Sequence, residues 1–435
     1  MEQKIKNRQI QTVFSVYSLS ALVLFLVFGL TRDGLGAGIQ GFLKVQQLPS
    51  QMTLDYFKAA TVSGAFLNVA LVGLAIQLVW KLTGASLNGG SFIGFFLTMG
   101  FAFFGMNVVN IWPCILGTFL YALVVKESFA AHANMAIFST ALAPFVSEMF
   151  FRYTPIQGSL ALRILCGIAI GLFAGFMMPI VCKKSPDMHK GLTILNAAGG
   201  AGFIAIFLYA LCFKAVGVEG PTNTDLGDSI PLAVNSYVAL TCVLDLILAY
   251  LFNGRSFKNV GDIFKKTGLG VDLTADRPAL AIFNVAVYSA FMTVFYNLIG
   301  CSMNGPTLAA IICTTCVAAS GGHVLNMIPI IIGYAIACTF CTFTMTTQAI
   351  ILGLCYAAGL APLAGSFGPL MGILAGMVHA ILVTQVVTSH NAFCFYNGGL
   401  TTIFTAIIFG TLLDTFFERD SKMRFNPLPI LKSRK

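Results

Sequence analysis

Charge is the scarcest property of this chain of 435 residues. Only 9% of the residues are charged, and Asp and Glu together number 16, whereas soluble domains average about 25% charged residues. The chain has 5 histidines and 2 tryptophans, and it lacks the HExxH, GxSxG and Walker A motifs. These shortages exclude an ordinary soluble domain and leave no recognisable enzyme signature. We therefore expect no enzyme, no catalytic residue, no metal and no cofactor.

Long apolar runs dominate the sequence instead. The chain is 57% hydrophobic, with a mean hydropathy of +0.86. Stretches such as 13–30 and 161–182 are long enough to cross a bilayer, which takes roughly 20 helical residues. They are apolar on every face and lack the two-residue alternation of a membrane β-barrel. We predict an all-α polytopic membrane protein whose first apolar run is a retained helix and not a signal peptide.

The positive charge follows the pattern of membrane loops. The formal net charge is +9, and most of the 25 basic residues lie in four segments, 4–8, 183–190, 255–277 and 419–435. The loop 213–230 is acidic by contrast. Cytoplasmic loops of membrane proteins are enriched in Lys and Arg. We therefore expect a cell (cytoplasmic) membrane location with both termini in the cytoplasm, and no nucleic-acid partner.

Twelve cysteines raise the question of disulfides. Nearly all of them lie inside apolar runs, including the pairs Cys313–Cys316 and Cys338–Cys341. A disulfide framework requires paired cysteines outside the membrane in an oxidising compartment. We interpret these cysteines as small packing residues of helices.

An internal repeat divides the chain into two halves. Residues 68–117 align with 284–333 without a gap, and 16 of the 50 aligned positions are identical. Shared hydrophobicity would not align the Asn, Pro and Gly residues as well. A weaker echo pairs HKGLTILNAAGG (189–200) with HNAFCFYNGGLT (390–401). We predict a first membrane repeat over 1–215 and a second over 216–435.

The charge pattern predicts that the two repeats have inverted topology. The segment before the first aligned region, 31–60, is mixed in charge, whereas its counterpart, 253–277, is strongly basic. Corresponding loops are therefore expected on opposite sides, which requires an odd number of segments per half. We predict about seven apolar segments in each half, some of them half-helices or re-entrant segments. They lie near 13–30, 61–82, 91–108, 110–126, 133–150, 159–182 and 191–212, and then near 232–252, 278–299, 305–322, 324–343, 346–364, 367–388 and 394–413.

The strongest site candidates are turn residues that occur once in each half. SLNGGSFIG (86–94) and SMNGPTLAA (302–310) place Asn-Gly beside segments that are otherwise apolar. A helix that begins inside a membrane leaves N–H groups without partners, which Asn can cap and a solute can contact. We predict that Asn88, Gly89, Asn304 and Gly305 line a solute pathway at the repeat interface. The alternative is that the glycines only permit close helix packing.

Four further asparagines belong to the same set of pathway candidates. Asn196 and Asn397 lie in small-residue segments that correspond between the halves, and Asn110 and Asn326 each precede a proline by three residues. For Asn110 and Asn326 a purely structural role, ending one helix and capping the next, is equally compatible with the pattern.

Ionisable residues inside apolar segments are candidates for proton or cation coupling. Asp245 is the one carboxylate deep in a predicted span, and His323 and His379 also lie in apolar segments. An Asp245–histidine pair would suit proton movement. The alternatives are a hydrogen-bonded structural Asp245 or a brace between Arg163 and Asp245, and the sequence slightly favours these.

Two families resemble the chain. SLNGGSFIGFFLTMGF (86–101) and YNGGLTTIFTAIIFG (396–410) resemble the Y-N-G-x-L-V-G stretch of urea transporters, which are inverted-repeat channels. FSTALAPF (138–145) matches their L-P-x-x-T-x-P-F motif only at Pro144 and Phe145. This distant resemblance implies a slot-like pathway for a small polar solute. Taken whole, the chain more closely resembles a bacterial integral membrane protein family known as domain of unknown function 1576, present as a tandem repeat.

Together these features favour a channel-like or facilitated transporter for a small polar solute, neutral or anionic. One alternative is a proton- or cation-coupled secondary transporter that uses Asp245. Another is an intramembrane enzyme, or a sensory or assembly membrane protein. An enzyme would gather Asp245, His323 and His379 around one cavity, whereas a channel would leave them apart. The expected partners are the lipid bilayer and the solute, with a homo-oligomer left open.

Overall fold

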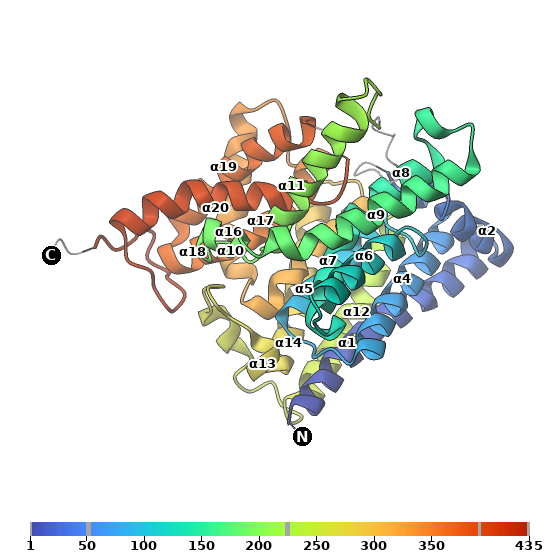
Figure 1. The fold of residues 1–435 in the computed structure, drawn as a ribbon. Helices are drawn as coiled ribbons and strands as arrows, with labels where there is room; N and C mark the ends of the chain where they lie inside the picture. The colour runs from blue at the N-terminus through green and yellow to red at the C-terminus, as the bar shows by residue number, and fades with distance from the viewer. Residues whose placement is uncertain (1, 49–53, 222–226, 390–392, 433–435) are drawn as a thin grey trace.

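The computed structural model describes residues 2–48, 54–221, 227–389 and 393–432 (Figure 1). These residues form helices and contain no strand apart from an isolated bridge between Phe417 and Leu431, which confirms the all-α prediction. The first half contains α1 (Glu2–Phe28), α2 (Leu35–Val45), α3 (Tyr56–Ala59), α4 (Val62–Thr83), α5 (Gly89–Phe101), α6 (Ile111–Val124), α7 (Phe129–Ser139), α8 (Ala143–Phe151), α9 (Leu160–Cys182), α10 (Ser185–His189) and α11 (Ala197–Tyr209). The second half contains α12 (Pro231–Phe252), α13 (Leu273–Asp276), α14 (Pro278–Leu298), α15 (Gly305–Thr314), α16 (Val324–Phe340), α17 (Gln348–Ala357), α18 (Ala361–Phe367), α19 (Pro369–Thr388) and α20 (Asn397–Phe416).

Ten helical segments in the described part of the chain are long and apolar enough to cross a membrane, so the chain is a multi-pass membrane protein. Four more apolar helices are shorter, Gly89–Phe101, Ile111–Val124, Gly305–Ser320 and Val324–Phe340. At 1.5 Å per residue, the 13 residues of α5 extend about 20 Å, less than a hydrocarbon core of about 30 Å. The fourteen predicted segments therefore all contain helices, and these four are too short or broken to be simple spans.

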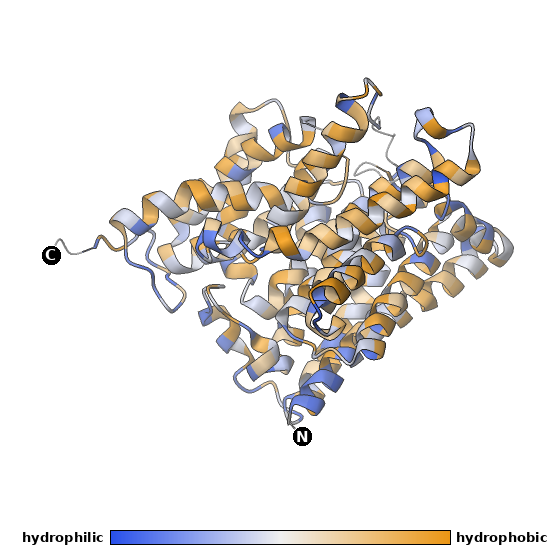
Figure 2. Ribbon diagram, viewed as in Figure 1, coloured by the Kyte–Doolittle hydropathy of each residue, from blue (hydrophilic) through white to orange (hydrophobic). Residues whose placement is uncertain are grey.

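The surface is apolar along the helices and polar at their ends. Figure 2 shows hydrophobic residues along the lengths of the helices and hydrophilic ones mainly in connecting loops and near the N-terminus. Large apolar side chains remain exposed on the outer helices, such as Leu165 of α9 at 62% and Leu123 of α6 at 57%. Water would not tolerate so many exposed apolar side chains, whereas lipid does. All twelve cysteines are free, as the sequence predicts.

The sequence repeat is also a repeat of helix packing. In the first half α1 packs on α4, α6 on α9, and α8 on α9. In the second half the corresponding pairs α12–α14, α16–α19 and α18–α19 pack in the same combinations. A left-handed glycine also follows each of two corresponding helices, Gly84 directly after α4 and Gly300 two residues after the end of α14, with φ of 68° and 74°. Each half is thus a variant of one helical unit.

The two halves meet through corresponding helices. α1 packs on α12, α5 on α15, and α11 on α20, and each of these pairs joins a helix to its own counterpart in the other half. Such self-paired contacts are what an approximate two-fold axis between the halves produces. The short helices α5 and α15 form one of these contacts, where the thiol of Cys313 reaches the carbonyl oxygen of Leu97 at 3.7 Å.

The end of α4 and the beginning of α14 lie at the same end of α1. Gln3 at the start of α1 bonds Ser86, which follows the end of α4, and Lys6 bonds the carbonyl oxygen of Ala275, which precedes α14. The start of α4 lies at the other end of α1, where the N–H of Ser63 bonds Asp33 at 2.8 Å. α4 therefore ends, and α14 begins, beside the N-terminus.

The tightest helix crossings also occur twice. A Cβ on Gly117 would overlap the backbone of Leu172, and one on Gly175 would overlap the backbone of Cys114, so α6 and α9 touch backbone to backbone. In the second half Gly333 and Gly376 stand in the same relation to Ile373 and Ile330, where α16 crosses α19. Small residues at such crossings let membrane helices approach closely.

Candidate functional site

Asn88 begins a helix and not a surface turn. Its side-chain oxygen accepts a hydrogen bond from the N–H of Ser91 at 3.2 Å, and the hydroxyl of Ser91 accepts one from the N–H of Asn88 at 3.2 Å. This reciprocal arrangement is a capping box, which satisfies two N–H groups that a helix start leaves open. A helix thus starts at the predicted Asn88-Gly89 pair.

Asn304 begins α15 in the same way. Its oxygen accepts from the N–H of Thr307 at 2.9 Å, and its amide donates to Gln348 of α17 at 3.3 Å. In the first half Asn134 of α7, the helix that corresponds to α17, donates to the side-chain oxygen of Asn88 at 3.0 Å. In each half, therefore, the capping asparagine is hydrogen-bonded to a side-chain amide group on the corresponding neighbouring helix, α7 in the first half and α17 in the second.

A carboxylate from the opposite half closes each helix start. Asp272, before α13, accepts a hydrogen bond from the N–H of Gly89 at 3.2 Å. Asp55, before α3, accepts one from the N–H of Gly305, also at 3.2 Å. We call these contacts the Asp272 clasp and the Asp55 clasp. Sequence reasoning missed both residues because they lie in loops, although they occupy corresponding positions before α4 and α14.

The clasps fill the places where an anion would bind. The positive end of a helix and its free N–H groups attract negative charge. Asp272 already supplies that charge to α5, and it also caps α13 through the N–H of Thr274 at 2.9 Å. Asp55 supplies it to α15 and caps α3 through Phe57 at 2.9 Å. The two helix starts are therefore neutralised by the protein itself.

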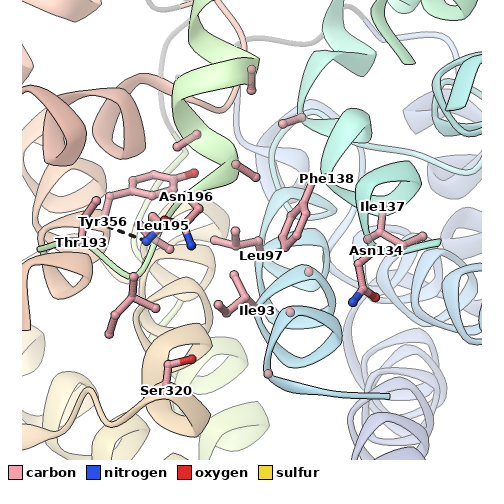
Figure 3. A pocket seen from close by; sticks show the side chains of 18 of the residues that line it. Ile93, Leu97, Asn134, Ile137, Phe138, Thr193, Leu195, Asn196, Ser320 and Tyr356 are labelled. Atoms are coloured by element: carbon pink, nitrogen blue, oxygen red, sulfur yellow. Dashed lines mark hydrogen bonds between the residues drawn. The ribbon is translucent and has the colours of Figure 1, made fainter. Parts of the chain in front are cut away.

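A cavity of about 500 Å³ opens beside the start of α5. Its walls are α5, α7 and the segment 186–201, with residues 268–272 at the rim. Figure 3 shows Ile93 and Leu97 of α5 lying across from Leu195 and Asn196. The lining is mainly apolar, and its polar members include Asn134, Asp272, Ser320 and four others (His189, Thr193, Asn196 and Thr140). No Lys or Arg is among the described residues that line it.

His189 and Asn196, seven residues apart in the sequence, come together at this cavity. Both line it. His189 is only 1% exposed, and its Nδ1 accepts a hydrogen bond from the N–H of Gly191 at 3.2 Å. Burial lowers the pKa of His189, against an opposing effect of the Asn196 amide. The ring is therefore neutral at pH 7.

The second helix start is sealed. Asn304 is fully buried and Asp55 is 1% exposed, whereas Asn88 is exposed and Asp272 is half-buried. Every residue from 303 to 323 is buried. Corresponding sites with the same hydrogen bonds thus differ in access: the α5 start lies beside an open cavity and the α15 start is enclosed by protein.

The other predicted pathway residues do not line this cavity. Asn110 and Asn326 hold the turns that follow the two short helices. The side-chain oxygen of Asn110 accepts from the N–H of Asn107 at 3.0 Å, and its amide donates to the carbonyl oxygen of Gly105. In the same way, Asn326 accepts from the N–H of His323 at 2.8 Å and donates to the carbonyl oxygen of Gly321. Asn397 is buried at the start of α20 and donates to the carbonyl oxygen of Cys394 at 3.0 Å. His390, its partner in the sequence echo, lies outside the described residues.

The three coupling candidates lie apart from one another. Asp245 accepts a hydrogen bond from the hydroxyl of Tyr17 at 2.8 Å where α1 meets α12, so the predicted alternative of a brace to Arg163 is not what holds it. His323 contacts the carbonyl oxygen of Lys266, and His379 contacts Tyr334 and the carbonyl oxygen of Gly398. None of the three lines the cavity.

Alanine at the two clasped glycines is expected to have unequal effects. A Cβ on Gly305 would lie 2.6 Å from the buried carboxylate of Asp55 and 3.1 Å from the carbonyl oxygen of Phe103, whereas one on Gly89 would lie 3.2 Å from Asp272, which borders the cavity and has room to move. Gly305→Ala should therefore cost about 1–3 kcal/mol of unfolding free energy and Gly89→Ala clearly less. Thermal unfolding of both variants in detergent checks this, and equal or reversed losses would contradict it.

The Asp55 clasp is expected to make stability depend on pH. Burial raises the pKa of Asp55 from 3.8 to about 6, against the opposing effects of hydrogen bonds from Phe57, Gly305 and Gly227 and the charge of Lys58. The folded protein thus binds this proton more tightly than the unfolded chain, and the resulting stability is complete below pH 3.8 and lost as the pH rises through about 6. The unfolding free energy of the wild-type protein should therefore fall by on the order of 2–3 kcal/mol between pH 4 and 7.5, and Asp55→Asn should abolish this fall. Unfolding of both proteins at the two pH values measures it, and an identical pH effect in the variant would refute it.

Comparison with known proteins agrees with the tandem organisation. The family described as protein of unknown function (DUF1576) matches residues 36–214 and 252–415. These two regions cover most of the chain and fall one in each half. No curated protein and no solved structure matches the chain. With matched regions in both of its structural repeats, the chain belongs to the DUF1576 family.

Proposed function

We propose that the protein is a membrane transporter that moves a small polar solute along a pathway at the interface of its two halves. The observation that carries the proposal is the cavity beside the capped start of α5, a short helix that begins after the exposed Asn88 and ends at the buried Phe101. Broken helices at a repeat interface are where membrane transporters bind their solutes. Mainly apolar walls with a few converging polar groups are also typical of small-molecule sites.

Inverted topology is part of the proposal. The opposite directions of α4 and α14, the self-paired helix contacts and the reciprocal clasps all support it. The positive-inside rule then places the N-terminus and the basic loops 183–190 and 255–277 in the cytoplasm. Pro186, His189 and Gly268 from these loops line the cavity, so in this proposal the cavity lies toward the cytoplasm and the enclosed α15 start toward the other side.

The separation of Asp245, His323 and His379 favours transport over intramembrane catalysis. An enzyme would bring such groups to one cavity, whereas here each is bonded elsewhere and none lines the cavity beside α5. A proton-coupled carrier that uses Asp245 is the second candidate. It is supported by the complete burial of Asp245 with a single hydrogen bond, from Tyr17, at the α1–α12 contact between the halves.

Solute flux into proteoliposomes tests the proposal. Purified protein is reconstituted, and the uptake of small neutral amides, weak acids and inorganic ions is measured with and without a proton gradient. We expect uptake of at least one small solute above that of empty liposomes. If no solute of the panel is taken up faster than by empty liposomes, the transport proposal is contradicted. Uptake that a proton gradient drives and Asp245→Asn abolishes would favour the coupled carrier.

A further inference from the structure

We propose that Asn196 is the solute-recognition residue of the cavity and that His189 is its positioning residue, for a neutral solute that carries a carbonyl or hydroxyl oxygen on an apolar body. The inference rests on the proposed transport function, and it adds the chemical class of the solute and the side chain that selects it.

The hydrogen bonds of His189 fix its tautomer. The N–H of Gly191 donates to Nδ1, so Nδ1 carries no proton. The buried ring is neutral, so the single ring proton lies on Nε2. Nε2 lies buried at the cavity and makes no hydrogen bond in the described part of the chain, and Asn196 lies close enough to affect the pKa of the ring. In our proposal this fixed N–H donor serves Asn196.

This donor orients the amide of Asn196. With its oxygen turned toward the N–H of His189, the Asn196 amide would leave its NH₂ group for the cavity. The backbone of Asn196 is held as well, because its carbonyl oxygen accepts from the hydroxyl of Ser185 at 2.6 Å. The side chain itself is exposed, and in Figure 3 it projects into the space that Leu97 borders. An oriented donor with no competing partner suits the oxygen of a solute.

Two other polar side chains of the cavity, Asn134 and Tyr356, are already engaged. The oxygen of Asn134 accepts from the indole of Trp80 at 3.0 Å and the hydroxyl of Ser91 at 2.9 Å, and its amide donates to Asn88. The hydroxyl of Tyr356 donates to the carbonyl oxygen of Phe395 at 2.7 Å. These groups support the walls of the cavity, whereas Asn196 is available to a ligand.

The electrostatics of the cavity favour a neutral solute. No Lys or Arg lines it, so an anion would find no counter-charge, and Asp272 already occupies the positive end of α5. The positive end of α5 also partly neutralises Asp272, which weakens the attraction of this carboxylate for a cation. Apolar walls formed by Ile93, Leu97 and Phe138 make the desolvation of any ion costly. An apolar body with one or two polar atoms matches this lining.

The test is concentration-dependent uptake by proteoliposomes that contain the whole protein, with acetamide and benzamide as neutral probes and acetate and methylammonium as charged ones. We expect saturable amide uptake by the wild-type protein and little uptake of the ions. Asn196→Ala should raise KM about tenfold, equivalent to about 1.4 kcal/mol, with the maximal rate nearly unchanged. His189→Ala should raise KM in the same direction, and His189→Gln, which keeps a donor, should restore much of the affinity.

Asn235→Ala is the matched control, because Asn235 pairs with Asn297 away from the cavity, and its KM should equal that of the wild type. Thermal unfolding of every variant separates loss of folding from loss of recognition. If the wild-type protein takes up the amides and the KM of Asn196→Ala is unchanged, the role of Asn196 is overturned while transport still stands. Uptake confined to acetate or methylammonium would overturn the solute class. Uptake of no probe above empty liposomes would count against the proposed function itself.

Discussion

Replacing both Ile93 and Leu97 with tryptophan is expected to reduce solute flux to a tenth of the wild-type rate or less. The two side chains lie on the face of α5 that borders the cavity (Figure 3), and two indoles would occupy much of the free space between α5 and the segment 193–196. Neither residue takes part in a clasp or a cap, so the fold should survive. Proteoliposome uptake of the solute that the wild-type protein transports measures the effect.

The control for this variant places the same two indoles where lipid is expected. Leu120 and Leu123 of α6 are 43% and 57% exposed, and their joint replacement by tryptophan should leave the flux within about twofold of the wild type, because membrane interfaces accept Trp readily. Equal flux in the cavity variant and the wild type, with both proteins folded, would show that the pathway does not pass between α5 and residues 193–196.

The largest loss of stability is expected from Gly376→Leu. Gly376 lies against the backbone of Ile330, so a side chain there cannot be accommodated by a rotamer change and must push α19 away from α16. Overpacking of a well-packed core typically costs about 1–3 kcal/mol, and this site lies at the upper end or beyond because both neighbours are main chain. Unfolding in mixed micelles measures the change.

Two controls bracket this prediction. Gly158 has open space around its Cβ position and an ordinary φ, so Gly158→Leu should change the unfolding free energy by less than about 0.5 kcal/mol. Gly175→Leu, the corresponding change in the first half, should destabilise as strongly as Gly376→Leu because Gly175 meets the backbone of Cys114. A stable Gly376→Leu protein would contradict the backbone contact between α16 and α19.

Hydropathy was sufficient to predict the helices, because each apolar run must satisfy its own backbone hydrogen bonds in a membrane. The Asn-Gly pairs at 88–89 and 304–305 predicted the helix starts, because an Asn before an apolar run can cap the open N–H groups of a helix. The lengths were harder to predict. Residues 91–108 are mostly apolar, and only the structure shows that α5 ends at Phe101.

The clasps and the one-sided cavity had no local signal. Asp55 and Asp272 lie in loops, and each acts on a helix of the other half, at sequence separations of 250 and 183 residues. Similar sequences also cannot reveal that Asn88 is exposed and Asn304 enclosed, because that difference arises from how the halves pack. Asp245 did have a local signal, because a carboxylate in an apolar run indicates a functional or structural charge. The sequence could not reveal that its hydrogen-bond partner is Tyr17.

The most direct test of the account is the side of the membrane from which each helix start is reached. Ser86 and Ser302 occupy corresponding positions just before the two caps, and both are exposed. Ser86→Cys and Ser302→Cys variants are treated with a membrane-impermeant thiol reagent in intact cells and in inside-out vesicles, with wild-type labelling as the background. Inverted repeats predict that Cys at 302 reacts in intact cells and Cys at 86 only in inside-out vesicles. Labelling of both positions from the same side would contradict the inverted arrangement and the pathway built on it.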